Sequence, residues 1–246
     1  VLLTDKNTKE INQTIKAFAT MELKPVEVYL RVAPITDGVE IDLGDEHNTR
    51  VRITSGNVEL LDKGSGTLFH RTHLTMPMTH PAEKGDLQKL KKYLRSIEAD
   101  HHILLIAWIS YTLAHPKGDS TNFVHLCILG PQGAGKSFLC RLLGTLIDPN
   151  VVNLQVLPRV LKDFMVAAQN GHVLFYDNIR TIQKNIADLM CGAANGTASS
   201  SRQLYTDDGV SVMFLHVAMV LNGIYDFVTE SDLVQRTLIL NLQQMD

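Results

Sequence analysis

Residues 130–137 read Gly130-Pro131-Gln132-Gly133-Ala134-Gly135-Lys136-Ser137 and fill the pattern Gly-x4-Gly-Lys-Ser/Thr at every fixed position. An apolar run at 123–129 leads into this stretch as a strand would, and apolar residues at helical spacing follow it at 138–143. In such a loop, glycines let backbone N–H groups turn toward phosphate oxygens at a helix start, which carries a partial positive charge. Lys136 would reach the β- and γ-phosphates, and Ser137 would offer its hydroxyl to Mg²⁺.

The stretch therefore predicts a site for a nucleoside triphosphate. The residues expected to bind the nucleotide are Gly130, Pro131, Gln132, Gly133, Ala134, Gly135, Lys136, Ser137 and Phe138.

The composition is that of an ordinary soluble globular protein, with 246 residues, 45% of them hydrophobic, and a net charge of −3. This mild negative charge means that any contact with nucleic acid must be local. Three cysteines without paired spacing argue against a zinc site or a disulfide framework and fit a reducing, cytoplasmic location. The histidine pairs at 70/73 and 101/102 lack a third ligand, so we expect no metal site built on histidine.

The most apolar stretch, at 103–113, is too short to span a bilayer, and no signal peptide is visible. We therefore expect no membrane association. Residue 1 is Val rather than Met, which is consistent with a fragment of a longer chain.

Periodicity divides the chain into three predicted parts. Helical spacing at 7–22 is followed by alternation at 26–32, 39–43 and 51–53, which predicts a small antiparallel sheet. Two helices should follow, one starting at Asp86 and running to 97, the other starting at Asp100 and ending before Pro116. From 123 onward strands and helices alternate, which is typical of a parallel α/β sheet. We accordingly expect a strand-rich module at 1–82, a helical connector at 83–120 and a P-loop domain at 121–246.

The connector helix has lysines and an arginine opposite its apolar face, at 89, 91, 92 and 95. This basic face has two interpretations: it is ordinary solvated surface, or it contacts phosphates.

A second element of nucleotide chemistry is the apolar segment 172–177, which ends in Asp177. A buried strand would deliver this carboxylate to the sheet edge beside Ser137, where it could hold Mg²⁺ as a Walker B aspartate does. We expect one strand at 151–156 and one helix at 160–168 between the two elements.

The segment 216–223 repeats this form with Asn222 at the strand end. Its amide could bond the γ-phosphate or orient the attacking water, although an Asn-Gly pair also suits a plain turn. Fourteen residues later, Arg236 precedes another apolar strand and could reach the γ-phosphate of a neighbouring subunit. The alternative for Arg236 is a surface pair with Asp232 on one helical turn.

Residues 199–212 predict a hairpin with an Asp-Gly turn between these two strands. Arg202 and Tyr205 could meet a nucleic-acid backbone and base by charge and stacking. Two aspartates near the tip oppose strong attraction to phosphate.

The order of these parts resembles the AAA+ ATPases of helicase superfamily 3. The strings GPQGAGKS, IDPN, YDNI, RQLYTDDG, VLNGI and DLVQRTLIL are similar to those in primase–helicase proteins of phages and mobile elements. The strings VYLRVAP, VEIDLGD, VRITSG and FHRTHLTMPMTHP resemble the module that precedes the ATPase in those chains.

This resemblance implies a ring-forming, hexameric ATP-driven motor on single-stranded or forked DNA, with Mg²⁺ and a partner or fused primase. The catalytic residues it implies are Lys136, Asp177, Asn178, Asn222 and Arg236, with Ser137 and Asp177 at the metal.

Asn178 departs from the pattern, because many AAA+ proteins have a catalytic Glu at this position. Either Asp177 or a nearby carboxylate such as Asp188 then positions the water, or hydrolysis is slow. A nucleotide-switched loader or defence protein that unwinds nothing is therefore the alternative function. A small-molecule kinase fits less well, because of the hairpin and the order of Asn222 and Arg236.

Overall fold

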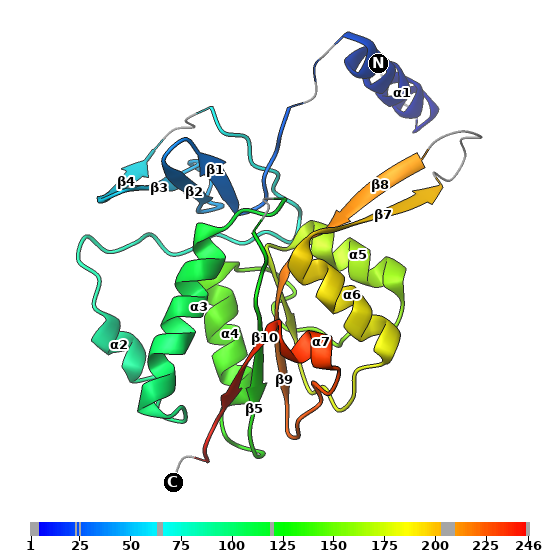
Figure 1. Ribbon diagram of the computed structural model, residues 1–246. Coiled ribbons are helices and arrows are strands. Elements are labelled where there is room, and N and C mark those ends of the chain that lie inside the picture. The colour runs from blue at the N-terminus through cyan, green and yellow to red at the C-terminus, as the bar shows by residue number, and fades with distance from the viewer. Residues whose placement is uncertain are drawn as a thin grey trace.

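The computed structural model describes residues 5–22, 24, 26–62, 66–118, 121–202 and 210–244 (Figure 1). Its centre is a four-stranded parallel sheet in the order β10-β5-β9-β6. The strands are β5 (His125–Leu129), β6 (Val173–Tyr176), β9 (Ala218–Gly223) and β10 (Thr237–Asn241). The parallel α/β sheet predicted from the alternation of elements is thus confirmed.

Helices cover both faces of the parallel sheet, and side chains alternate between the two cores. One core joins α3 (His102–Ala114) and α4 (Lys136–Ile147) to the sheet, and the other joins α5 (Leu161–Asn170), α6 (Lys184–Asn195) and the short α7 (Ser231–Val234). On β5, for example, Leu126 and Ile128 enter the first core, whereas Cys127 and Leu129 enter the second. A strand buried on both faces reads as a continuous apolar run, which is why 123–129 could be recognised.

A second sheet precedes the connector and is an antiparallel meander. It consists of β1 (Val32–Ile35), β2 (Gly38–Asp42), β3 (Arg50–Thr54) and β4 (Asn57–Leu61), in that order. The predicted antiparallel sheet is therefore present. The alternation at 26–32 does not form a strand before Val32, where β1 begins. Val26 and Val28 are exposed, and Tyr29 forms an isolated bridge with Phe69.

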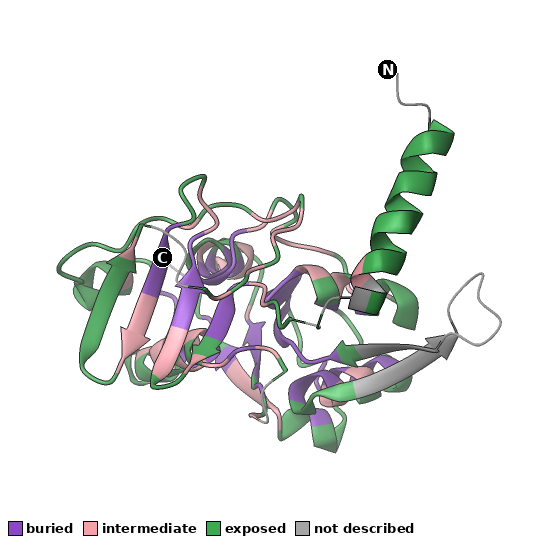
Figure 2. Cartoon of the chain, turned by 90° about the horizontal axis from the view of Figure 1, so that it is seen from above, coloured by how far each residue is buried: buried purple, intermediate pink, exposed green. Residues whose placement is uncertain are grey.

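The helical segments before the parallel sheet differ from the prediction in their bounds. Helix α1 (Asp5–Glu22) is exposed from Asp5 to Phe18 and projects from the body (Figure 2). Asp86 caps α2 (Leu87–Lys91) by accepting from the backbone N–H of Gln88 at 2.9 Å, but the helix ends at Lys91 instead of reaching 97. Turns then bury Leu94 and Ile97. Asp100 lies inside a 3-10 turn (Ala99–His101) and does not cap α3.

The strand expected at 151–156 was also wrong. Only Gln155 pairs with the sheet, donating to the carbonyl of Phe175 and accepting from the N–H of Asp177. Val151 and Val156 are 63% and 84% exposed, so their apolar character does not reflect burial in a sheet. No helix among the described residues is both long and apolar enough to cross a membrane.

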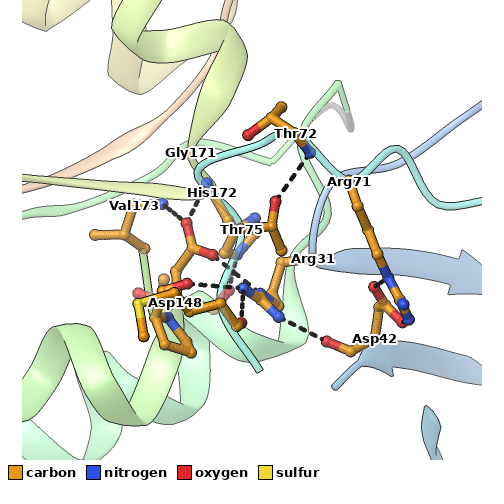
Figure 3. Close-up of polar contacts among 12 residues, drawn as sticks. Arg31, Asp42, Arg71, Thr72, Thr75, Asp148, Gly171, His172 and Val173 are labelled. Atoms are coloured by element: carbon orange, nitrogen blue, oxygen red, sulfur yellow. Dashed lines mark hydrogen bonds and ion pairs between the residues drawn. The ribbon is translucent and has the colours of Figure 1, made fainter. Parts of the chain in front are cut away.

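A buried arginine joins the antiparallel sheet to the parallel one (Figure 3). Arg31 is 1% exposed, and its Nε donates to Oδ1 of Asp148 at 2.9 Å, while its other nitrogens donate to the carbonyls of Asp42, Met76 and Pro149. Oδ2 of Asp148 accepts from the backbone N–H groups of His172, at 2.6 Å, and Val173, at 3.3 Å. Both charges therefore have partners on every side, as buried ions require.

We expect Arg31→Met to lower the free energy of unfolding by about 3–5 kcal/mol, because Asp148 would remain as a buried charge without its cation. Urea unfolding followed by circular dichroism measures this change. The control is Lys6→Ala, which removes a solvent-exposed pair with Glu10 and should cost less than about 1 kcal/mol. A cost for Arg31→Met no larger than that of the control would contradict the buried linkage.

Candidate nucleotide site

The loop between β5 and α4 has the backbone shape that its glycines allow. Gly133 and Gly135 both have φ of +85°, a region that other residues enter only at a cost, and α4 starts directly after Gly135. Ala134 between them is buried. The loop therefore presents its backbone at the N-terminus of a twelve-residue helix, an arrangement that favours anions.

Lys136 and Ser137 are the first two residues of α4, and their side chains form hydrogen bonds with different partners. The Lys136 ammonium donates to the carbonyls of Gly130 and Pro131, each at 2.8 Å. Burial lowers the pKa of Lys136, and the Asp177 carboxylate opposes that effect. The Ser137 hydroxyl donates to Asp177, with Oγ 3.1 Å from Oδ1 and 3.4 Å from Oδ2. Residues forty positions apart thus meet because β5 and β6 both pair in parallel with β9.

The Ser137 hydroxyl and the Asp177 carboxylate are oxygen ligands of the kind that Mg²⁺ prefers. No group of three or more His, Cys, Asp or Glu side chains suited to a metal occurs in the described part of the chain. A Mg²⁺ here would need phosphate oxygens and water for its remaining positions, which fits a metal that arrives with a triphosphate.

Asn222 is buried at the end of β9, and its amide holds the turn after β6. Its Oδ1 accepts from the backbone N–H of Asn178 at 3.1 Å, and its Nδ2 donates to Sγ of Cys140, also at 3.1 Å. Asn178 has φ of +55°, a left-handed conformation that asparagine tolerates better than most residues. The Asn222 amide nitrogen carries two N–H groups, and the contact with Cys140 uses one of them.

A cavity of about 630 Å³ gathers these side chains at the carboxyl edge of the parallel sheet. Its walls are Gln132, Gly133, Gly135, Lys136, Ser137, Phe138, Asp177, Asn178, Arg180, Asn222, Gly223 and Ile224. Gly130, Pro131 and Ala134, also expected at the nucleotide, do not line it. Asp188, a candidate for the water-activating carboxylate, lies exposed on α6 and outside this cavity. Asp177 is therefore the one carboxylate among the described residues that line it.

Arg236 lies at the other end of the sheet. Arg236 precedes Thr237, which pairs with His125 at the start of β5, whereas the loop at 130–135 follows the end of β5. Its guanidinium donates to the carbonyl of Asp232 at 2.7 Å and to Oδ1 of Asn195 at 3.3 Å. The contact with Asp232 therefore goes to its backbone and not to its carboxylate. Arg236 is separated from the cavity of its own chain by the length of the sheet.

The predicted hairpin is present as β7 (Thr197–Arg202) and β8 (Val210–Leu215), which pair antiparallel over six residues. It leaves the end of α6 and returns to the start of β9, so it rises from the same sheet edge as Arg236 (Figure 1). Tyr205 and the Asp-Gly turn lie outside the described residues, as does the side chain of Arg202.

Comparison with known proteins establishes the family. A family model for an actinomycete integrative conjugative element replication protein matches residues 87–246, which is more than half of the chain. The chain belongs to this family of replication proteins. The match contains the whole parallel sheet and the hairpin, and the antiparallel sheet precedes it.

No curated protein matches the chain. A solved structure of JCV helicase with a bound acetamide compound is 10% identical, with a TM-score of 0.39. That match covers 62% of this chain and 44% of the helicase chain, and so spans less than half of it. At this TM-score the likeness does not bear on function.

Two residues at the site of this replication protein did not stand out in the sequence. Arg180 lines the cavity three residues after Asp177, and that short spacing is the signal that could have revealed it. Tyr93 follows α2, and its ring centroid lies 6.2 Å from that of Phe138 at the cavity wall. Nothing in the sequence indicates that 93 and 138 meet.

The contacts of Asn222 give a test of its positioning role. Asn222→Ala should lower the free energy of unfolding by about 1–3 kcal/mol, because the Asn178 N–H loses its acceptor and the left-handed turn loses its anchor. Thermal and urea unfolding measure the loss. The control Asn170→Ala removes a half-buried asparagine whose amide donates to the carbonyl of Val166 in its own helix, and should cost less. Equal effects would contradict the role of Asn222 in holding the turn.

Proposed function

We propose that this replication protein is an ATP-dependent DNA helicase or translocase that hydrolyses ATP between the subunits of a ring, and that the ring has six subunits, as its resemblance to superfamily 3 implies. The proposal rests on one observation: the candidate nucleotide-binding residues and Arg236 lie at opposite edges of one sheet. Lys136, Ser137 and Asp177 lie at the carboxyl edge, while Arg236 lies at the opposite edge. Membership in a family of replication proteins supports a protein that acts on DNA.

Each residue at the carboxyl edge has a chemical task in this proposal. The backbone of the loop and Lys136 would bind the phosphates, and Ser137 and Asp177 would hold Mg²⁺. The metal would offset charge that develops on the transferred phosphoryl group. Asp177 would also accept a hydrogen bond from the attacking water, because Asn178 has no basic carboxylate.

Arg236 would complete the site of a neighbouring chain. An arginine supplied by a neighbour stabilises negative charge in the transition state and is absent until the subunits assemble. The hairpin rises from the same edge as Arg236, so an assembly that closes the nucleotide site would also set the position of the hairpin. Arg202 and Tyr205 remain the proposed contacts with single-stranded DNA.

The second candidate is a nucleotide-switched loader or assembly protein that binds ATP without unwinding DNA. Asn178 favours this candidate, because it replaces a glutamate that activates water in many related ATPases. A fork-unwinding assay separates the two functions when ATP is compared with a slowly hydrolysed analogue. Rings that form on DNA but unwind nothing would exclude the helicase and favour the switch.

Turnover measurements test the shared site. Lys136→Ala should abolish ATP hydrolysis, whereas Arg236→Ala should bind ATP normally and hydrolyse it roughly 10³–10⁵-fold more slowly. Mixing the two inactive variants should restore part of the activity, because some interfaces would combine an intact Lys136 with an intact Arg236. Lys162→Ala, which removes an exposed lysine of α5, is the control and should remain active. Mixtures that stay inactive would exclude a role for Arg236 between subunits.

A further inference from the structure

The turn after β6 carries an arginine to which the roles above assign nothing. Arg180 is exposed, lies three residues after Asp177, and lines the same cavity as Lys136 and Ser137. Within the part of the chain that the structure describes, no hydrogen bond or ion pair engages its guanidinium. Its charge is therefore available to a ligand in that cavity.

The backbone that leads to Arg180 is fixed from two sides. The N–H of Ile179 donates to the carbonyl of Asn222 at 2.8 Å, and the Ile179 side chain is buried. Gly223 permits this close approach, because a Cβ there would lie 2.4 Å from the carbonyl oxygen of Ile179. With Asn178 held by the Asn222 amide, Arg180 extends from an anchored turn, so little order would be lost when it binds a ligand.

The charges of the side chains that line the cavity favour the binding of a phosphate group by Arg180. The other charged side chains among the described lining residues are Lys136 and Asp177, which offset one another. A triphosphate remains negative after Mg²⁺ binds, so this pair alone would leave the ligand without a net counter-charge. Arg180 makes the wall net positive, and a guanidinium fork suits the oxygens of a phosphate group.

A neighbouring cavity of about 430 Å³ indicates which phosphate Arg180 would reach. It shares Asp177, Asn178 and Arg180 with the larger cavity and adds Arg159, which does not line the larger one. Arg180 thus lies at the boundary between the two cavities, on the side of the larger cavity that Asp177 lines. Ser137 and Asp177 would hold a Mg²⁺ that accompanies the terminal phosphates and offsets their charge, so the terminal phosphate would lie on the Asp177 side.

We propose that Arg180 is a catalytic residue that acts within its own chain, binding the terminal phosphate of the nucleotide and distinguishing a triphosphate from a diphosphate. The inference rests on the proposed function, since it requires a nucleotide in the larger cavity. It differs from the role of Arg236, which acts on a neighbouring chain.

Equilibrium binding of Mg·ATP and Mg·ADP to the full chain tests the proposal. Arg180→Ala should weaken ATP binding by at least about 10-fold and ADP binding by less than about 3-fold, as expected when a charge-assisted bond to one phosphate is lost. Arg159→Ala is the matched control, because it removes an exposed arginine that lines only the smaller cavity, and it should leave the ratio of the two affinities unchanged. Equal weakening of ATP and ADP, no weakening, or the same change in Arg159→Ala would overturn the role of Arg180.

The same measurements separate this inference from the function on which it rests. If the unaltered chain binds neither nucleotide, both proposals fail. If it binds both and Lys136→Ala binds neither, while Arg180→Ala behaves as the unaltered chain, only the assignment of Arg180 fails. Unfolding curves for Arg180→Ala and Arg159→Ala should coincide, which shows that any loss of affinity is local.

Mixed assemblies test whether Arg180 acts within its own chain. In a mixture of Arg180→Ala and Lys136→Ala, every nucleotide site lacks one of the two residues if both act in the same chain, so hydrolysis should not recover. Recovery to the level of the Arg236→Ala and Lys136→Ala mixture would show that Arg180 acts on a neighbour and would overturn the proposal.

Discussion

Helix α4 is fixed to strand β6 at both of its ends, and the candidate site depends on this double attachment. At the start of the helix, the Ser137 hydroxyl donates to Asp177, which follows the strand. At its end, the carboxylate of Asp148 accepts from the N–H groups of His172 and Val173, where the strand begins. The helix therefore cannot slide along the strand without breaking a polar contact. The 130–135 loop and the Asp177 carboxylate keep one relative position as a result.

The attachment at Asp148 also ties the site to the antiparallel sheet. Arg31 neutralises Asp148 and reaches the backbone on both sides of the junction, so the end of α4 and the antiparallel sheet share one buried charge pair. Polar contacts at the two ends of α4 thus link Ser137 and Asp177 at one end, and Asp148 and Arg31 at the other, where Arg31 precedes the family match.

Local sequence was enough to predict the elements whose burial is complete. The apolar runs that became β5, β6 and β9 are buried on both faces, and the glycines of the loop have conformations that require glycine. The errors lie where apolar residues stay exposed, as at Val151 and Val156, or where tertiary contacts shorten a helix, as after Lys91. The partners of Asn222 depend on how β9 sits between its neighbours, and the place of Arg180 depends on a left-handed turn at Asn178. Neither feature leaves a periodic signal in the sequence.

We infer that one chain holds both halves of a site that closes only between chains. Particle mass in solution, measured by sedimentation with and without ATP and single-stranded DNA, tests it most directly. We expect a defined closed assembly that forms with ATP and DNA and is lost when ATP is withheld. A chain that binds ATP but stays monomeric under every condition would contradict it.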